Sequence, residues 1–94
     1  MVSIEVKITG SRKWLAGIIE DHHGGVNPLD FQQDVARIGV AAGGPAWLSL
    51  YFWGNPGDEI KAEISKGDLS LAKRSYKIDP DGSAARAIQF DPDA

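Results

Sequence analysis

The chain has 94 residues, 43% of them hydrophobic, with three Trp, two Tyr and three Phe. This length and composition predict a single domain, residues 1–94, with one core. The absence of cysteine excludes disulfide bonds, thiolate metal sites and cysteine nucleophiles, and fits a reducing cytosol. The net charge is −3 and no basic patch stands out, which argues against binding to nucleic acid.

The N-terminal segment alternates apolar and polar residues, with Val2, Ile4, Val6 and Ile8 on one face. This alternation predicts a first strand with one buried face. The segment lacks the basic region and continuous apolar block of a signal peptide, and no apolar run reaches the ~20 residues of a membrane helix. We therefore expect a soluble, cytoplasmic protein that does not bind membranes. A second strand is predicted near Trp14–Glu20.

A helix is predicted between about residues 27 and 42. Asn27 suits an N-cap and Pro28 suits the first helical position. Gly43-Gly44-Pro45 is a typical stop signal. Apolar side chains between these signals fall on one helical stripe: Phe31, Val35, Ile38 and Ala42.

After the helix, the aromatic segment Trp47–Trp53 predicts a strand whose two faces both need cover. Turn signals at residues 55–58, 65–68 and 79–82 then predict a meander of strands over 59–65, 70–78 and 84–90. The expected fold is therefore α+β. A mainly antiparallel sheet of five or six strands carries one helix on one face, in the order strand, strand, helix and four strands.

The loop lengths also predict which residues share a face, if each turn is a two-residue hairpin loop. Trp53 is then expected opposite Ile60, Ile64 opposite Leu69, and Leu71 opposite Phe90. The helix-covered face is then expected to hold Tyr51, Trp53, Ile60, Ala62, Ile64, Leu69, Leu71, Ile88 and Phe90. The opposite face carries an uncovered apolar patch: Leu48, Leu50, Phe52, Tyr76 and Ile78. Exposed apolar patches mark interfaces, so these five residues are the predicted protein-binding surface. A bulge at Pro56-Gly57 would exchange the two faces.

The cluster Asp21-His22-His23 is the candidate metal site, because zinc is commonly held by His with Asp or Glu. Adjacent histidines diverge in a strand and the chain has no third His, so a carboxylate such as Asp58 or Asp79 would have to complete the site. The alternative interpretation is a pair of exposed loop histidines. No metal or other cofactor is predicted.

Two further motifs fit ordinary turns better than ligand sites. Gly24-Gly25 precedes the predicted helix, but Asp30 and Asp34 would repel a bound phosphate. Asp79-Pro80-Asp81-Gly82 resembles the opening of a calcium loop but lacks the later ligands. No serine has a nucleophile-elbow context, so we do not expect an enzyme.

The leading hypothesis is a small protein-interaction module, such as an inhibitor, immunity or accessory protein of bacterial or phage type. One alternative is a homodimer whose interface is formed by Leu48, Leu50 and Phe52. A second alternative is a metal-dependent enzyme that uses Asp21, His22 and His23. An acidic DNA mimic is a weaker possibility, because the charge is low and dispersed.

Overall fold

The computed structural model describes residues 1–94, and all its regular elements are β-strands. The strands are β1 (Val2–Thr9), β2 (Trp14–Glu20), β3 (Val26–Pro28), β4 (Val35–Val40), β5 (Ala46–Trp53), β6 (Glu59–Lys66), β7 (Leu69–Lys77) and β8 (Ser83–Phe90). They form two four-stranded sheets, in the orders β4-β1-β6-β7 and β3-β2-β5-β8. Every pairing is antiparallel.

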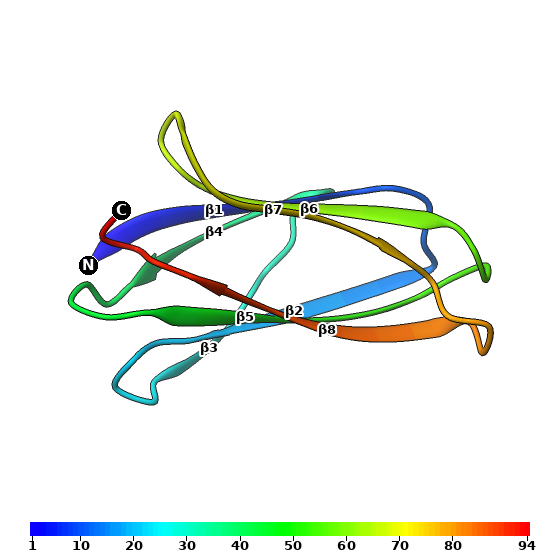
Figure 1. Cartoon of the computed structure of the whole chain (residues 1–94), viewed down its shortest axis with the longest axis horizontal. Coiled ribbons are helices and arrows are strands. Elements are labelled where there is room, and N and C mark those ends of the chain that lie inside the picture. The colour runs from blue at the N-terminus through cyan, green and yellow to red at the C-terminus, as the bar shows by residue number, and fades with distance from the viewer.

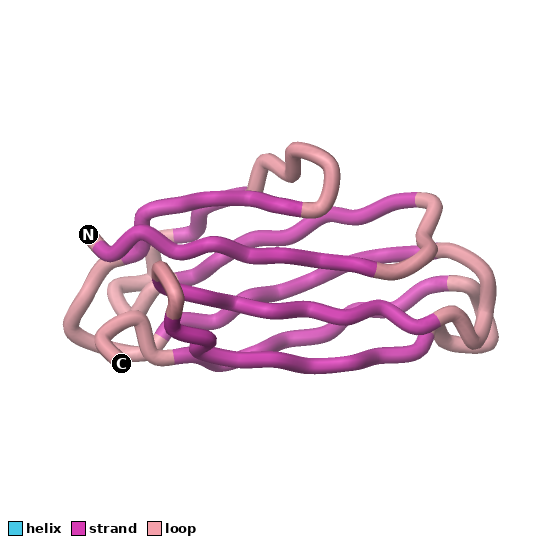
Figure 2. The backbone as a smooth tube through the Cα atoms, turned by 90° about the horizontal axis from the view of Figure 1, so that it is seen from above, coloured by secondary structure: helices cyan, strands magenta, loops and turns pink.

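The two sheets pack face to face as a sandwich (Figure 1). Only β2–β3 and β6–β7 are consecutive strands that pair within one sheet, and every other connection passes from one sheet to the other. Most of these crossing loops lie at the ends of the molecule (Figure 2), whereas the β3–β4 connection crosses near its middle (Figure 1). The structure contains no helix that could span a membrane.

The core is one cluster of 16 buried residues from both sheets. Alternation along the strands explains it, because every second side chain of a strand points to the same face. In β1 these inward residues are Ile4, Val6 and Ile8, as the sequence predicts. At about 25 cal/mol per Å² of apolar surface removed from water, this shared core is the main stabilising contribution.

The predicted α+β fold is wrong, because residues 27–42 form no helix. The segment contains β3, a connecting loop and β4. β4 pairs with β1, with Val40 opposite Val2 and Ile38 opposite Ile4. Val and Ile favour extended backbone, and Gly39 weakens a helix further. Apolar residues at 36, 38 and 40 also alternate with period two, so the helical stripe competed with a strand pattern that burial favoured.

The turn at Asn55–Asp58 is present, with Gly57 at φ 87° and the Asp58 N–H donating to the Asn55 carbonyl at 3.2 Å. It does not close a hairpin, because it carries the chain from β5 in one sheet to β6 in the other. Trp53 therefore lies opposite Trp14 and Ser83. The predicted pairing of Trp53 with Ile60 is wrong, because a turn signal does not specify which sheet the next strand enters.

The other two turns differ from prediction in a similar way. The turn at residues 79–82 also crosses between sheets, so Phe90 lies opposite Ala46 instead of Leu71. The β6–β7 hairpin is real, but its loop places Lys66 opposite Leu69, and a bulge follows between Ile64 and Ser65.

These pairings reverse the predicted faces of β5. Leu48, Leu50 and Phe52 are at most 1% exposed and belong to the core. Trp47, Tyr51 and Trp53 are 37%, 43% and 50% exposed on the outer face. Other residues expected on the helix-covered face are buried, but against the opposing sheet and not against a helix: Ile60, Ala62, Ile64, Ile88 and Phe90. Leu69, from the same predicted set, is 48% exposed.

Candidate binding surface

The five residues of the predicted protein-binding surface lie in or against the core. Leu48, Leu50, Phe52 and Ile78 are buried, and Tyr76 is partly buried against them. A partner or a second copy of the chain has no access to the four buried side chains in the folded protein. The opposing sheet, and not a helix or a partner, covers this face of β5.

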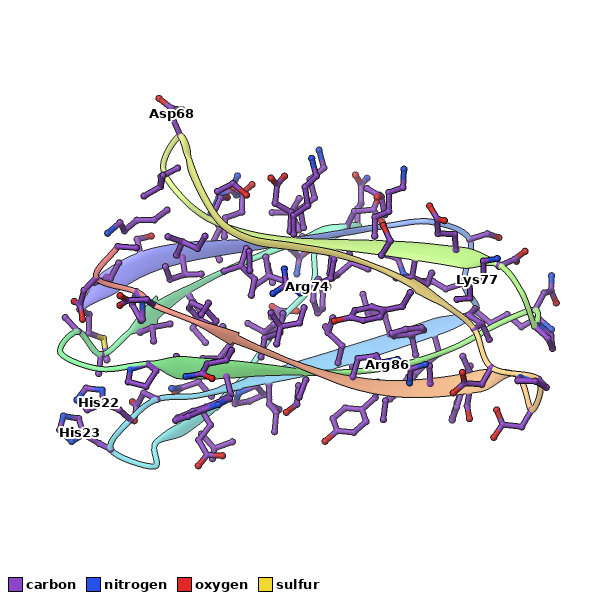
Figure 3. The ribbon with its side chains drawn as sticks, viewed as in Figure 1. His22, His23, Asp68, Arg74, Lys77 and Arg86 are labelled. Carbon is purple, nitrogen blue, oxygen red and sulfur yellow. The ribbon has the colours of Figure 1, made fainter.

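The Asp21-His22-His23 segment forms a tight turn after β2. Asp21 is buried, and its Oδ1 accepts hydrogen bonds from the backbone N–H groups of His23 and Gly25, both at 2.9 Å. The two histidine rings pack on each other, with centroids 3.9 Å apart, at one end of the molecule (Figure 3). The His22 ring also lies against Gly44, where an added Cβ would sit 2.6 Å from its Cγ.

This turn carries little of the chemistry that a metal site needs. The Asp21 carboxylate already closes the turn, and the Nδ1 atom of His22 is buried without a hydrogen-bond partner. No three His, Cys, Asp or Glu side chains lie close enough together to hold a metal ion. The three residues therefore organise a chain reversal that packs against the loop before β5.

The outer face of the sheet β3-β2-β5-β8 is the most distinctive surface of the molecule. We call it the aromatic face and define it by the outward residues of the four strands. They are Trp14, Ala16, Ile18, Glu20, Val26, Pro28, Trp47, Ser49, Tyr51, Trp53, Ser83, Ala85, Ala87 and Gln89. Glu20 is the one charged residue among them.

Four large aromatic side chains stand on this face. Trp14 and Trp53 are directly opposite each other on β2 and β5, and their rings stack with centroids 4.7 Å apart. Tyr51 has Ala16 on one side and Ala85 on the other, and these small side chains leave its ring exposed. A shallow groove of about 360 Å³ runs between these rings and the start of β8.

The outer face of the other sheet has the opposite character, and we call it the charged face. It consists mostly of Lys, Arg and Glu, and its charged residues are Glu5, Lys7, Arg37, Glu59, Lys61, Glu63, Lys73 and Lys77. Opposite charges alternate across the strands, as in the row Lys7, Glu63, Lys73. Arg37 pairs with Glu5 at 3.0 Å. These charges compensate one another, which is typical of a solvated surface.

A third region is the side of the sandwich where β7 and β8 are the edge strands. Arg74 and Arg86 lie there in the space between the two sheets (Figure 3). The Arg86 guanidinium lies 5.6 Å from the centroid of the Tyr76 ring and 3.0 Å from Asp79 Oδ1. Arg74 has no carboxylate partner, and its Nη1 donates to the neighbouring Lys73 carbonyl at 2.8 Å. On this side Arg86 is therefore paired with a carboxylate, and Arg74 is the cation without one.

The sequence prediction of an exposed apolar stripe on β5 chose the incorrect side of the strand, because Leu48, Leu50 and Phe52 are buried. One signal could have separated the sides. The stripe of Leu48, Leu50 and Phe52 is purely hydrocarbon, whereas the stripe of Trp47, Ser49, Tyr51 and Trp53 carries hydroxyl and indole N–H groups. Polar groups of this kind need a partner when they are buried, so the hydrocarbon stripe is the better core candidate.

Comparison of the chain with protein-family models, curated proteins and solved structures found no match.

Proposed function

We propose that this protein is a binding module that recognises another protein through its aromatic face. The observation that supports the proposal most is the concentration of Trp14, Trp47, Tyr51 and Trp53 on a face with a single charged residue. Tyr and Trp are enriched in the centres of protein interfaces, and charged residues are depleted there. Extended exposed apolar patches are uncommon on monomers and often mark interfaces.

The size of the face supports a partner protein better than a permanent homodimer. Four strands of up to eight residues, at ~3.3 Å per residue and ~4.8 Å between strands, span roughly 26 by 19 Å, or about 500 Å². A stable interface of standard size covers about 800 Å² on each partner, and obligate dimers need more. The aromatic face therefore fits one part of a larger contact with a partner protein.

An inhibitor, immunity or accessory protein is the class that we propose, acting in the cytoplasm. A preformed face on a rigid sandwich suits such a role, because little ordering entropy is lost on binding. The absence of cysteine supports a reducing compartment.

The proposal is tested by affinity purification of the tagged protein from its own host, with Tyr51→Glu as the variant and Leu69→Glu as its control. Tyr51 and Leu69 are similarly exposed, at 43% and 48%, but Leu69 lies on the β6–β7 hairpin away from the aromatic face. We expect a stoichiometric partner that the Tyr51→Glu variant loses at least tenfold and the Leu69→Glu variant retains.

Equal recovery of the partner by both variants would overturn the proposal, as would the absence of any stoichiometric partner. Light scattering after size exclusion tests the alternative that the protein is a homodimer. A dimer that Tyr51→Glu dissociates would assign the aromatic face to self-association instead of to another protein.

A further inference from the structure

The free edge of β8 has a defined hydrogen-bonding pattern. The Gly54 N–H donates to the Gly82 carbonyl at 2.9 Å, which sets the phase of the β5–β8 ladder. In an antiparallel pair, hydrogen-bonded and non-hydrogen-bonded residues alternate. Ala84, Arg86 and Ile88 therefore direct their backbone groups at β5, and the residues between them direct theirs away. Ser83 confirms this phase, because its carbonyl accepts from the Asp79 N–H at 3.3 Å.

The outward backbone groups beyond Ser83 have almost no partners in the protein. β8 pairs with β5 alone, so the N–H and C=O groups of Ala87 and Gln89 are unpaired, as is the Ala85 N–H. The Ala85 carbonyl accepts only from the Arg86 side chain at 2.9 Å. Backbone groups of this kind form a template for another strand.

The other edge strands carry features that discourage such pairing. β3 has three residues and includes Pro28. β7 has a bulged register and carries Lys73, Arg74 and Lys77. β4 has six residues, and its first residue, Val35, bonds back to Gln32. β8 has eight regular pairs with β5 and contains no Pro or Lys. It is therefore the least protected edge of the sandwich, with Arg86 as its one charged residue.

We propose that β8 accepts an extended segment of the partner protein as a fifth strand of its sheet. This inference rests on the proposed protein-binding function and names the form of the partner. Added backbone hydrogen bonds to Ala85, Ala87 and Gln89 would hold the segment. Its alternate side chains would contact the outer and the inner face of the sheet and so determine which segments bind.

The surroundings of β8 define the chemistry of that segment. Side chains on its outer face would lie beside Ala85 and Ala87 and extend the aromatic face, so apolar residues fit there. Side chains on its inner face would lie on the open side that carries Arg74, which has no carboxylate partner, and Arg86, which is paired with Asp79. Acidic residues fit there because they would give Arg74 a partner. The partner segment therefore alternates acidic and apolar residues.

A second copy of β8 fits this edge less well. Antiparallel pairing of two copies must match inward residues with inward residues. The central registers then place the two Arg86 side chains directly opposite or diagonal to each other. These positions lie within about 8 Å in an antiparallel pair, and like charges at that distance disfavour it.

The test uses a synthetic eight-residue peptide of alternating Val and Glu, with a Val and Lys peptide as its charge control. Amide hydrogen exchange followed by NMR is the readout. In the free protein the amides of Ala87 and Gln89 should exchange faster than those of Arg86 and Ile88. The Val and Glu peptide should slow the exchange at Ala87 and Gln89, and the Val and Lys peptide should bind at least tenfold more weakly.

The variant Ala87→Pro removes an outward N–H without breaking a ladder bond, and Ala87→Ser is its control. We expect Ala87→Pro to weaken peptide binding at least tenfold and Ala87→Ser to preserve it. If the proline variant does not fold, N-methylation of the peptide replaces it. Methyl groups on the N–H groups that face β8 should abolish binding, and methyl groups on the N–H groups that face away from β8 should not.

Absence of protection at Ala87 and Gln89, or equal binding of both peptides, would overturn the inference. Protection of the same amides by a rise in protein concentration alone would also overturn it, in favour of a dimer. Recovery of the host partner by the variants distinguishes the proposed binding by the aromatic face from the proposed strand addition at β8. A partner lost with Tyr51→Glu but kept with Ala87→Pro leaves the aromatic face as the binding surface and removes β8 from it. Absence of any host partner removes the proposed function itself.

Discussion

Gly10 occupies the tightest place in the backbone, where the chain leaves β1 and crosses to β2. Its φ is +117°, and a Cβ at this position would lie 2.2 Å from the Glu59 carbonyl oxygen. The obstructing atom belongs to the backbone at the start of β6, so no side-chain rotation relieves the contact. Glycine is therefore required here both by its conformation and by the space available.

Gly10→Ala should lower the free energy of unfolding by about 2 kcal/mol or more, because conformational strain and steric overlap act together. Gly57→Ala is the matched control, since Gly57 also has a positive φ, +87°, but no atoms within 4 Å. Its cost should be about 1 kcal/mol, from conformation alone. Urea denaturation measures both values, and equal losses would contradict the role of the Glu59 contact.

The strand β5 shows at the scale of the element how burial selects one of two apolar faces. Its inward stripe is buried between the sheets, and its outward stripe forms the centre of the aromatic face. Consecutive residues of one strand therefore have different energetic roles. Leu50 contributes to the core, whereas Tyr51 contributes to the surface.

Leu50→Ala should lower the free energy of unfolding by about 2–5 kcal/mol, because it leaves a cavity in a close-packed core. Tyr51→Ala should change it by less than about 1 kcal/mol, since the ring is exposed. Chemical denaturation followed by far-UV circular dichroism gives both numbers. A larger loss for Tyr51→Ala than for Leu50→Ala would show that the faces are assigned the wrong way round.

Most strands could be predicted from the sequence, and their partners could not. The alternation of Val2 to Ile8 locates β1, and the turn residues at 55–58 and 79–82 locate chain reversals. Neither signal is sensitive to whether a reversal stays in one sheet or crosses to the other. The apolar residues of segment 35–40 fit both the helical period and the period of two that is typical of a strand. Only the pairing of this segment with β1 decides between helix and strand.

The candidate site was less predictable than the strands for the same reason. Trp47 to Trp53 is visible in the sequence as an unusual segment, but its exposed side depends on which face the other sheet covers. The free edge of β8 depends on strand order, which is a property of the whole sheet. No local pattern between Ser83 and Phe90 distinguishes an edge strand from a central one.

At the scale of the whole molecule, the sandwich should unfold as one unit. A single core joins both sheets, and the chain crosses repeatedly between them. All three tryptophans, Trp14, Trp47 and Trp53, lie on the aromatic face, so their fluorescence reports on one sheet. Far-UV circular dichroism reports on both sheets.

Denaturation curves from the two signals should coincide in midpoint and slope, because neither sheet has a core of its own. An equilibrium urea titration that records fluorescence and circular dichroism on the same samples makes the comparison. A fluorescence transition that precedes the circular dichroism transition would show that the sheet bearing the aromatic face melts separately.

The repeated crossing also determines what would follow from cutting the chain at the open loop around Gly57. The first fragment would carry β1 to β5 and the second β6 to β8, so each would hold strands of both sheets. The seam between them would run through both sheets, along the β1–β6 and β5–β8 pairings. Each fragment alone would expose half a core, and together they could rebuild it. The fold is thus suited to fragment complementation, in which two fragments that do not fold alone associate and regain the native structure.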